Sequence, residues 1–315
     1  MQAGQGRTVL EVAKELSCDW HTVNDADLTY GEALLAADRK RPNQSIAIGL
    51  DETSFVKLGH HVHTAYATTV ADVQNHQIIE ILPTRRYEDV TRGMNAQPEV
   101  WKERIKYGAL DMSSAYAADY GVVLPRAAQV VDPFHVISLA NRCLYSVRRR
   151  VQSEQLGHRG RRDDPLYRIR RVLSIGEEKL NEQGSARRQS LFTLGDPNAE
   201  VALAYRVKER LRDFDRTTDS EEARRILEDL HGHGRRREIP PKIQKLGRTI
   251  RDWFDQICNV HLARVSNGPT ESLNNLIKRI KQIAFGFRNF QNYRIRARLF
   301  AGRPSWRVLE SIVVR

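Results

Sequence analysis

Three acidic residues of this 315-residue chain stand where they could hold a divalent cation together. Asp51 and Asp111 each follow a short apolar run, and Glu271 lies in the first turn of an amphipathic helix that Pro269 suits as a start. Carboxylate oxygens are the protein ligands that Mg²⁺ takes beside water and substrate phosphate oxygens. Two such ions about 4 Å apart support in-line phosphoryl displacement. The pattern therefore predicts metal-dependent chemistry on a phosphodiester, provided that the fold brings the three side chains together.

Taken alone, Asp51 leaves two interpretations open. The run 46–50 is apolar on both faces, which predicts a buried central strand. A carboxylate beside such a strand is costly to bury unless it is paired or binds a metal. An ordinary turn aspartate at a strand end explains the same segment. Glu52 should point to the other face of its strand, so we do not expect it to be a ligand.

Composition narrows the class of protein. The length allows two domains, or one large domain with an insertion. No apolar run reaches the roughly 18–20 residues of a membrane span, and the N-terminus lacks a signal-peptide core, so we expect a cytoplasmic protein without a membrane partner. The three cysteines form no CxxC pair, which argues against disulfides and structural zinc. A net charge of +12 points to a polyanionic partner.

The N-terminal pattern predicts two short helices joined by a tight turn, with Asp19 as the N-cap of the second. Such a pair is a candidate helix-turn-helix, and its second helix would place Trp20, His21 and Thr22 near DNA bases. A helical hairpin packed on the next domain explains the same pattern, and on the local pattern alone we favour it. A basic stretch, 39–42, follows as a linker.

The segment 45–133 alternates between strand and helix patterns. The expected strands are 46–50, 62–70, 77–82, 107–110 and 127–131. The first three, separated only by turns, predict an antiparallel meander. Helices are expected over 90–105 and 114–120, and near the C-terminus over 269–283 and 293–300.

A long charged region separates Asp111 from Glu271, which are 160 positions apart (271 minus 111). That distance is too long for a plain α/β core and predicts an insertion, which the pattern makes helical. Arginines cluster in it at 148–150, 161–162, 170–171, 187–188 and 235–237. We favour phosphate contacts for some of them; solvated helix faces are the alternative.

Four stretches resemble DDE transposases of bacterial insertion sequences, specifically the ISL-three family. They are 49–55, 110–113, 131–136 and 266–302, the most specific part being 267–278 continued by 286–294. The resemblance implies an α/β fold, a ribonuclease-H-like catalytic core interrupted by an all-helical insertion, with a short helix-turn-helix-like N-terminal segment. In that fold the first and fourth strands are neighbours and a C-terminal helix crosses the sheet, which would gather the three acids.

The resemblance implies an activity and a division of the chain. The activity is cleavage and joining of DNA element ends with Mg²⁺, or Mn²⁺ in its place, by Asp51, Asp111 and Glu271. The implied partners are double-stranded DNA, the terminal inverted repeats and target DNA, with self-association in a DNA complex at the bacterial nucleoid. The expected segments are 1–41 (N-terminal helices and linker), 42–135 (first part of the core), 136–260 (helical insertion) and 261–315 (last part of the core).

Further residues are candidates for DNA contact or active-site support. Lys278 lies two turns after Glu271 and shares its helix face; a solvated lysine is the alternative. The DNA-binding candidates are Lys278, Arg279, Arg288 and Arg294, with Trp20, His21 and Thr22. Asp132 and His135 form an Asp-x-x-His element that either supports the active site or merely caps a strand-to-helix turn. The histidines at 60, 61 and 63 are expected to be solvated turn residues.

One departure from the family bears on function. Its members usually carry an N-terminal zinc ribbon, whereas this chain has no paired cysteines and begins partway into the helix-turn-helix region. The alternative to a transposase is therefore a non-catalytic remnant that binds DNA or interferes with a full-length partner. A nuclease of the same fold acting on RNA–DNA hybrids is disfavoured by the long insertion and the basic helices.

Overall fold

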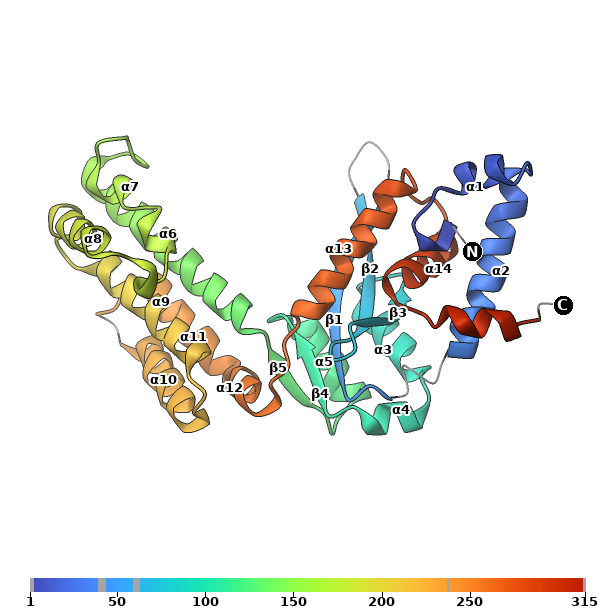
Figure 1. Ribbon diagram of the computed structural model, residues 1–315. Coiled ribbons are helices and arrows are strands. Elements are labelled where there is room, and N and C mark those ends of the chain that lie inside the picture. Colours follow the sequence, from blue (N-terminus) through green and yellow to red (C-terminus); the bar gives the residue numbers. More distant parts are fainter. Residues whose placement is uncertain (1–2, 39–43, 59–62, 237, 314–315) are drawn as a thin grey trace. The chain divides into compact units, whose positions relative to one another are not determined.

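The computed structural model describes residues 3–38, 44–58, 63–236 and 238–313 (Figure 1). The expected linker 39–42 and the histidines at 60 and 61 lie outside the described residues. The chain divides into two compact units, the first formed by Met1–Asp132 with Val265–Arg315 and the second by Pro133–Arg264. In the described part of the chain, no helix is long and apolar enough to cross a membrane.

A mixed five-stranded sheet is the centre of the first unit. Its strands are β1 (Ala47–Leu58), β2 (His63–Asp72), β3 (Gln77–Leu82), β4 (Tyr107–Leu110) and β5 (Ala128–Val131). They lie in the order β3-β2-β1-β4-β5. β1, β2 and β3 are antiparallel neighbours, which confirms the predicted meander, and β4 and β5 run parallel to β1.

Strand β1 is longer than the sequence predicted. We expected it to end at Leu50, but it continues to Leu58 because β2 pairs with it on both sides of Asp51. A bulge between Ser54 and Val56 interrupts the register. The polar residues after Leu50 thus obtain ladder hydrogen bonds from their neighbour, which the apolar pattern of a single strand could not reveal.

The helix expected over 90–105 is in fact two helices, α3 (Tyr87–Asn95) and α4 (Glu99–Arg104). Pro98 stands at the N-cap of α4, and a proline there disfavours helical backbone in the residue before it. Helix α5 (Ser114–Val123) follows β4 and packs on the sheet, where Tyr120 donates a hydrogen bond to the Ala109 carbonyl at 3.0 Å.

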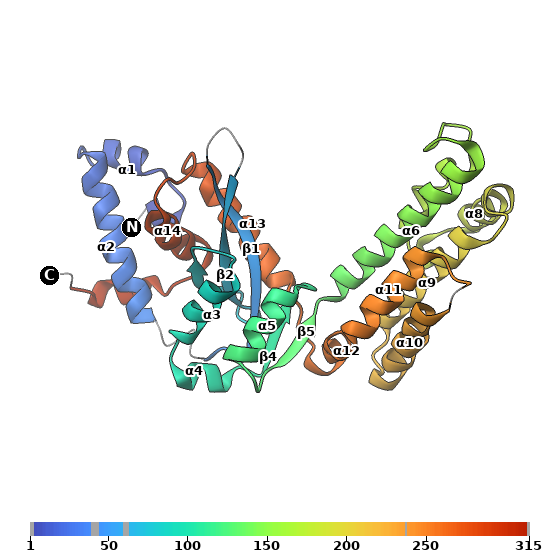
Figure 2. The same ribbon diagram turned by 180° about the vertical axis from the view of Figure 1, so that it is seen from behind.

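Two C-terminal helices, α13 (Gly268–Ile283) and α14 (Phe290–Ala301), pack against the sheet, as both ribbon views show (Figures 1 and 2). Their buried residues form one apolar cluster with β2 and β3. The cluster includes Ala67, Ala71, Ile78, Ile81, Leu273, Ile277, Ile280, Phe287, Tyr293 and Ala297. The sequence predicts a buried stripe on the amphipathic helix α13, made of Leu273, Leu276, Ile277, Ile280 and Ala284. The stripe is confirmed, with Leu276 and Ala284 only partly covered.

The N-terminal helices α1 (Val9–Glu15) and α2 (Trp20–Ala37) are joined by a short turn, and Asp19 caps α2 by accepting from the Thr22 backbone N–H at 3.0 Å. They pack beside α14. The buried Arg296 of α14 donates to the Ala3 carbonyl at 3.0 Å. Two 3₁₀ turns, Ala3–Gln5 and Trp306–Ser311, complete this end of the unit.

The described residues of the second unit form helices and no strand. The helices are α6 (Pro133–Leu156), α7 (Pro165–Arg168), α8 (Glu182–Gly195), α9 (Glu200–Arg216), α10 (Ser220–Gly232), α11 (Pro241–Asp252) and α12 (Phe254–Ala263), with 3₁₀ turns at Val172–Ser174, Glu177–Lys179 and His233–Arg235. Apolar side chains such as Leu144, Leu211 and Phe214 are buried within it. The unit therefore has its own core.

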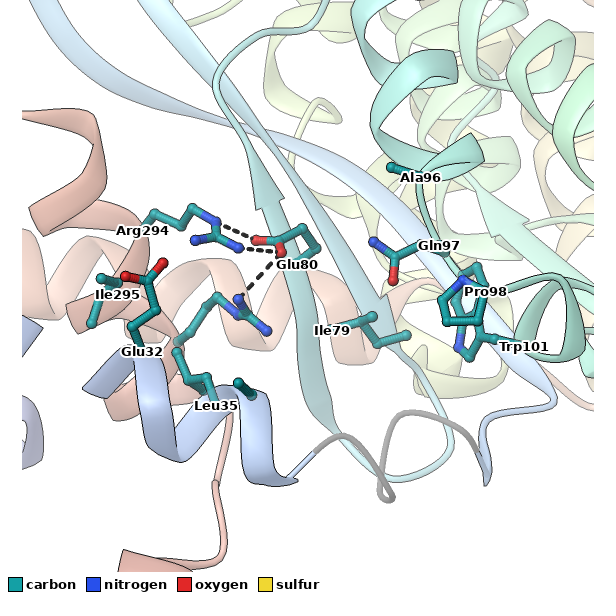
Figure 3. A pocket seen from close by; sticks show the side chains of 12 residues that line it. Glu32, Leu35, Ile79, Glu80, Ala96, Gln97, Pro98, Trp101, Arg294 and Ile295 are labelled. Carbon is teal, nitrogen blue, oxygen red and sulfur yellow. Dashed lines mark hydrogen bonds and ion pairs between the residues drawn. The ribbon is translucent and has the colours of Figure 1, made fainter. Parts of the chain in front are cut away.

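A charged cluster fastens α14 to strand β3 (Figure 3). Arg294 binds Glu80 through two hydrogen bonds, at 2.7 Å from Nε and 2.5 Å from Nη2, and Arg298 adds a third at 3.2 Å. These side chains line a cavity of about 260 Å³ together with Trp101. The bond to Glu80 raises the pKa of the Arg294 guanidinium. Glu80 thus pairs with two cations that are mostly withdrawn from water, and Glu32 adds a longer-range attraction for Arg294.

We predict that Glu80→Gln lowers the free energy of unfolding by roughly 2 kcal/mol, between the values for exposed and fully buried ion pairs. The glutamine keeps the shape of the side chain but removes the carboxylate that binds both covered guanidinium groups. Urea unfolding followed by tryptophan fluorescence measures the loss.

The matched control for this prediction is Glu228→Gln. Glu228 pairs with Arg224 on the surface of α10, where both side chains are about half exposed. Its replacement should change stability by less than about 0.5 kcal/mol. Equal effects of the two substitutions would show that the Glu80 cluster contributes no more than a surface ion pair.

Candidate active site

Three aspartates stand side by side where the parallel pairing of β1, β4 and β5 stops. Leu50 of β1 is in register with Leu110 of β4, which in turn is in register with Val131 of β5. The next residue along each strand is Asp51, Asp111 or Asp132. Because parallel strands present equivalent positions at one edge of the sheet, the register itself brings these carboxylates close together.

Asn267, immediately before α13, contacts all three strands at this position. Its side-chain Nδ2 donates to Asp111 Oδ1 at 3.1 Å and to the Leu50 carbonyl at 3.3 Å. Its backbone N–H donates to Asp132 Oδ2 at 2.9 Å. Asn267 is buried. One neutral residue therefore fixes where α13 starts relative to β1, β4 and β5.

A second asparagine, Asn274, connects α13 to Asp51 on β1. Its Nδ2 donates to Asp51 Oδ2 at 2.7 Å, and its Oδ1 accepts from the Thr69 hydroxyl of β2 at 2.7 Å. The other carboxylate oxygen of Asp51 accepts from the Glu52 backbone N–H at 2.7 Å. Glu52 itself is exposed and pairs with Arg85, which confirms that it points away from Asp51. The Asp51 carboxylate is thus held in one orientation.

The close approach of α13 to β1 depends on the absence of a side chain at Gly49. A Cβ atom there would overlap with Thr270 Oγ1 and Asn267 Oδ1, and would crowd Val73. Those two oxygens are buried and accept no hydrogen bond from the residues that the structure describes. A glycine is required because helix and strand are in direct contact at this point.

Glu271 lies on the face of α13 that carries the two asparagines. It comes four residues after Asn267 and three before Asn274, spacings that share one helix face. The side chain is exposed. Sequence reasoning passed over both asparagines, although their spacing around Glu271 was visible in the block 267–278. Within the described part of the chain, no three His, Cys, Asp or Glu side chains stand close enough to hold a metal ion.

The electrostatics of the aspartate pair nevertheless fit a divalent cation. Burial raises the pKa of the Asp51 carboxyl above its ordinary value, and the Asp111 carboxylate raises it further, while the hydrogen bond from Asn274 opposes the shift. The amides of Asn274 and Asn267 hold these two carboxylates without adding positive charge, so the amides do not reduce the repulsion between them. A hard cation is the species that would relieve it, and oxygen donors are what Mg²⁺ or Mn²⁺ would bind.

The basic residues of α13 differ in what they contact. Lys278 is exposed on the face of Glu271, and its Nζ lies 3.3 Å from Asn275 Oδ1. Arg279, one position on, is also exposed. Lys281 was not singled out from the sequence, yet its Nζ donates to the Ser54 carbonyl at the bulge of β1. Burial lowers the pKa of Lys281, and the Lys278 charge lowers it further.

The other DNA-binding candidates are spread over the first unit. Arg288 is exposed in the segment between α13 and α14, whereas Arg294 is occupied by Glu80. Trp20 and His21 are exposed at the start of α2, with their rings in edge-on contact. The Thr22 hydroxyl donates to Asp19 at 2.6 Å, so it already serves the helix cap.

Asp132 and His135 fall in different units. Asp132 is buried and accepts the Asn267 backbone N–H described above, which is a direct link to the aspartate edge. His135 lies in the first turn of α6, where its ring meets that of Phe134 edge-on. The supporting role predicted for Asp132 thus has a geometric basis, and that of His135 stays a prediction.

In three arginine pairs of the second unit, one side chain is covered and its neighbour is exposed. Arg148 is buried and donates to Gln152, while Arg149 beside it is exposed. Two further pairs repeat this: Arg170 stacks on Tyr167 next to exposed Arg171, and Arg188 binds Glu177 next to exposed Arg187. In the helical pairs Arg148–Arg149 and Arg187–Arg188, adjacent positions point about 100° apart, so one side chain packs inward while the other faces solvent.

Comparison with known proteins places this arrangement in a family. Residues 48–297, most of the chain, match the family model described as "Transposase" for DDE enzymes of the ISL3 (ISL-three) type. The chain belongs to the ISL-three family of DDE transposases. The resemblance drawn from the motifs is therefore confirmed.

Individual relatives agree with that assignment. The chain is 27% identical over 300 residues to "Transposase for insertion sequence element IS1001" of Bordetella parapertussis, an alignment covering 93% of this chain and 70% of that protein. It is 27% identical over 268 residues to "Transposase for insertion sequence element IS1557" of Mycobacterium tuberculosis, covering 78% and 57% respectively. A 58-residue match to an "ATP-dependent protease" of Lactococcus lactis, 43% identical, covers only 18% of this chain.

We predict that Gly49→Ala lowers the free energy of unfolding by about 2 kcal/mol, because the added methyl group overpacks a closed helix–strand contact. The first turn of α13 must move away from β1, which lengthens the bonds from Asn267 to the strand ends. Chemical denaturation measures the loss.

Gly121→Ala is the matched control. A Cβ atom at Gly121, within α5, would meet nothing within 4 Å. Alanine favours helix, so this substitution should raise stability by up to about 1 kcal/mol. If Gly49→Ala were equally harmless, the contact between α13 and β1 would not be as close as the structure has it.

Proposed function

We propose that this chain is a transposase that cleaves and joins DNA element ends, with Asp51, Asp111 and Glu271 as its catalytic residues. The observation that carries the proposal is the pair Asp51 and Asp111 on adjacent parallel strands, each bound by an asparagine that shares a helix face with Glu271. The strand and helix positions match the order in which a DDE enzyme carries its acids.

The sheet supports a ribonuclease-H-like core. Three antiparallel strands in chain order, followed by two strands parallel to the first, give the order β3-β2-β1-β4-β5. In this reading the core is 42–135 with 261–315, and 136–260 is the all-helical insertion. The compact unit Pro133–Arg264 supports that division.

Asp51, Asp111 and Glu271 are the residues that would hold a divalent cation. Bound there, Mg²⁺ or Mn²⁺ would polarise a phosphodiester and activate water or a 3′ hydroxyl for attack. The contribution of the other residues is orientation. Asn274 fixes Asp51, and Asn267 fixes Asp111 and, through Asp132, the end of β5. Fixed carboxylates need little reorganisation when the reaction begins.

The proposed partners are double-stranded DNA at the terminal repeats of the element and at the target site, with a second copy of the chain in the complex. A formal charge of +12 supports the polyanion. Exposed Lys278 would contact the DNA backbone near the scissile phosphate as a point charge. Exposed arginines such as Arg288 would add phosphate contacts farther from the acids.

We predict that Asp51→Asn, Asp111→Asn and Glu271→Gln each abolish Mg²⁺-dependent cleavage of a duplex carrying the element's terminal repeat. Each change removes a ligand charge with little change in shape, so the circular dichroism spectrum and the DNA affinity in EDTA should be retained. Gel analysis of end-labelled DNA measures cleavage.

Glu52→Gln is the matched control, since Glu52 neighbours Asp51 but pairs with Arg85 instead. It should cleave like the unmodified chain. A triad variant that still cleaves removes that residue from the site. If the unmodified chain binds the terminal repeat but does not cleave it, the protein is the non-catalytic remnant.

We also predict that Lys278→Ala weakens binding of a pre-cleaved element end and slows strand transfer more than Arg279→Ala does. Both residues are exposed on α13, but only Lys278 shares the face of Glu271. Measuring both variants on one substrate provides the comparison. Equal effects would assign the DNA to a different face of the helix.

A further inference from the structure

A groove on the first unit is lined by segments far apart in the sequence. Helices α1 and α2 form one side, and the segment between α13 and α14 forms the other, enclosing a cavity of about 660 Å³. Its walls include the aromatic side chains Trp20 and Phe285 and the guanidinium of Arg288. Two segments that the sequence marked as separate DNA candidates therefore meet in one hollow.

Phe285 is an unusual residue for its position. The Gly286 N–H bonds to the Lys281 carbonyl at 2.8 Å and the Phe285 N–H to the Gln282 carbonyl at 3.0 Å, which together form a Schellman motif ending α13. Phe285 is the left-handed residue of that motif, with φ +54°, a place where glycine is usual. A side chain there costs conformational free energy.

Burial does not compensate Phe285 for that strain. The side chain is 93% exposed, the highest value among the exposed large apolar residues of the described chain. Trp20 across the groove is 41% exposed. The fold thus holds an aromatic ring in water at a backbone position that disfavours it, so the ring is not kept for packing.

Charge selects the kind of ligand. Among the described residues that line the groove, Arg288 and Arg296 are basic and none is acidic. Arg296 is buried and turned toward the N-terminal segment and Asp27, whereas Arg288 is exposed. A groove with aromatic faces, an exposed guanidinium and no carboxylate suits an anion that carries a planar ring.

We propose that this groove binds an unpaired nucleotide of DNA, with its base stacked on Phe285 and its phosphate bound by Arg288. Aromatic side chains beside a positively charged track are the usual means of holding unpaired bases, since every base has a face that can stack. The proposal rests on the proposed DNA function, but it concerns a site separate from the acids.

The test compares two DNA hairpins in EDTA, one fully paired and one with a single unpaired 2-aminopurine. The unmodified chain should bind the unpaired form more tightly and quench its fluorescence. Phe285→Gly should reduce affinity for that form by roughly tenfold, the size of one stacking interaction, and abolish quenching, while the paired hairpin binds as before. Phe285→Trp should keep both properties.

Stability gives a second, opposite readout. Because glycine suits the left-handed position, Phe285→Gly should raise the melting temperature while it weakens binding. Tyr87→Ala, which removes an exposed aromatic outside the groove, is the control and should leave the preference intact. Arg288→Ala should lower affinity for the unpaired form without raising the melting temperature.

Three results would overturn the proposal. They are an unchanged preference in Phe285→Gly, a lower melting temperature in that variant, and a concentration-dependent dimer that Phe285→Gly dissociates while the preference persists. The last would assign the groove to a second copy. Affinity for the paired hairpin and cleavage by the acids report on the proposed function, so either proposal can fail without the other.

Discussion

The hydrogen bonds of Asn267 are the interactions on which the aspartate edge depends. Asn267 binds the Leu50 carbonyl within β1 and the aspartates that directly follow β4 and β5. It can reach them only because Gly49 lets the start of α13 lie directly on β1. The direction of α13, and with it the placement of Glu271 and Lys278, follows from this contact. Gly49 and the Asn267 amide thus determine which face of α13 meets the carboxylates.

The chain holds carboxylates in two contrasting ways. Glu80 is neutralised by two guanidinium groups, so it fastens α14 to the sheet and has no charge left to offer. Asp51 and Asp111 are held by amides, which orient a carboxylate without cancelling its charge. Burial is the main cause of the raised pKa of the Asp51 carboxyl, and the nearby Asp111 carboxylate raises it further. Neutral donors are what a cation site needs, because an arginine in their place would compete with the metal.

Much of the fold could be predicted from the sequence, because the apolar periodicities were local. Strands β3 and β4, the Asp19 cap and the buried stripe of α13 follow from patterns within single segments. What could not be predicted depends on partners elsewhere in the chain. The extension of β1 past Asp51 is a property of its pairing with β2. The roles of Asn267 and Asn274 appear only when α13 is laid across the sheet.

The positions of the basic residues also depend on partners elsewhere in the chain. A count of basic residues predicts a polyanionic partner, but it cannot tell which of them face outward. Arg294 was a DNA candidate and proves to be bound to Glu80, and Arg148 is buried against Gln152. In three pairs of the second unit one arginine is covered while its neighbour reaches solvent, whereas Arg161 and Arg162 are both exposed. The net charge of +12 therefore favours a polyanionic partner, while only the arginines that reach solvent are candidates for phosphate contacts.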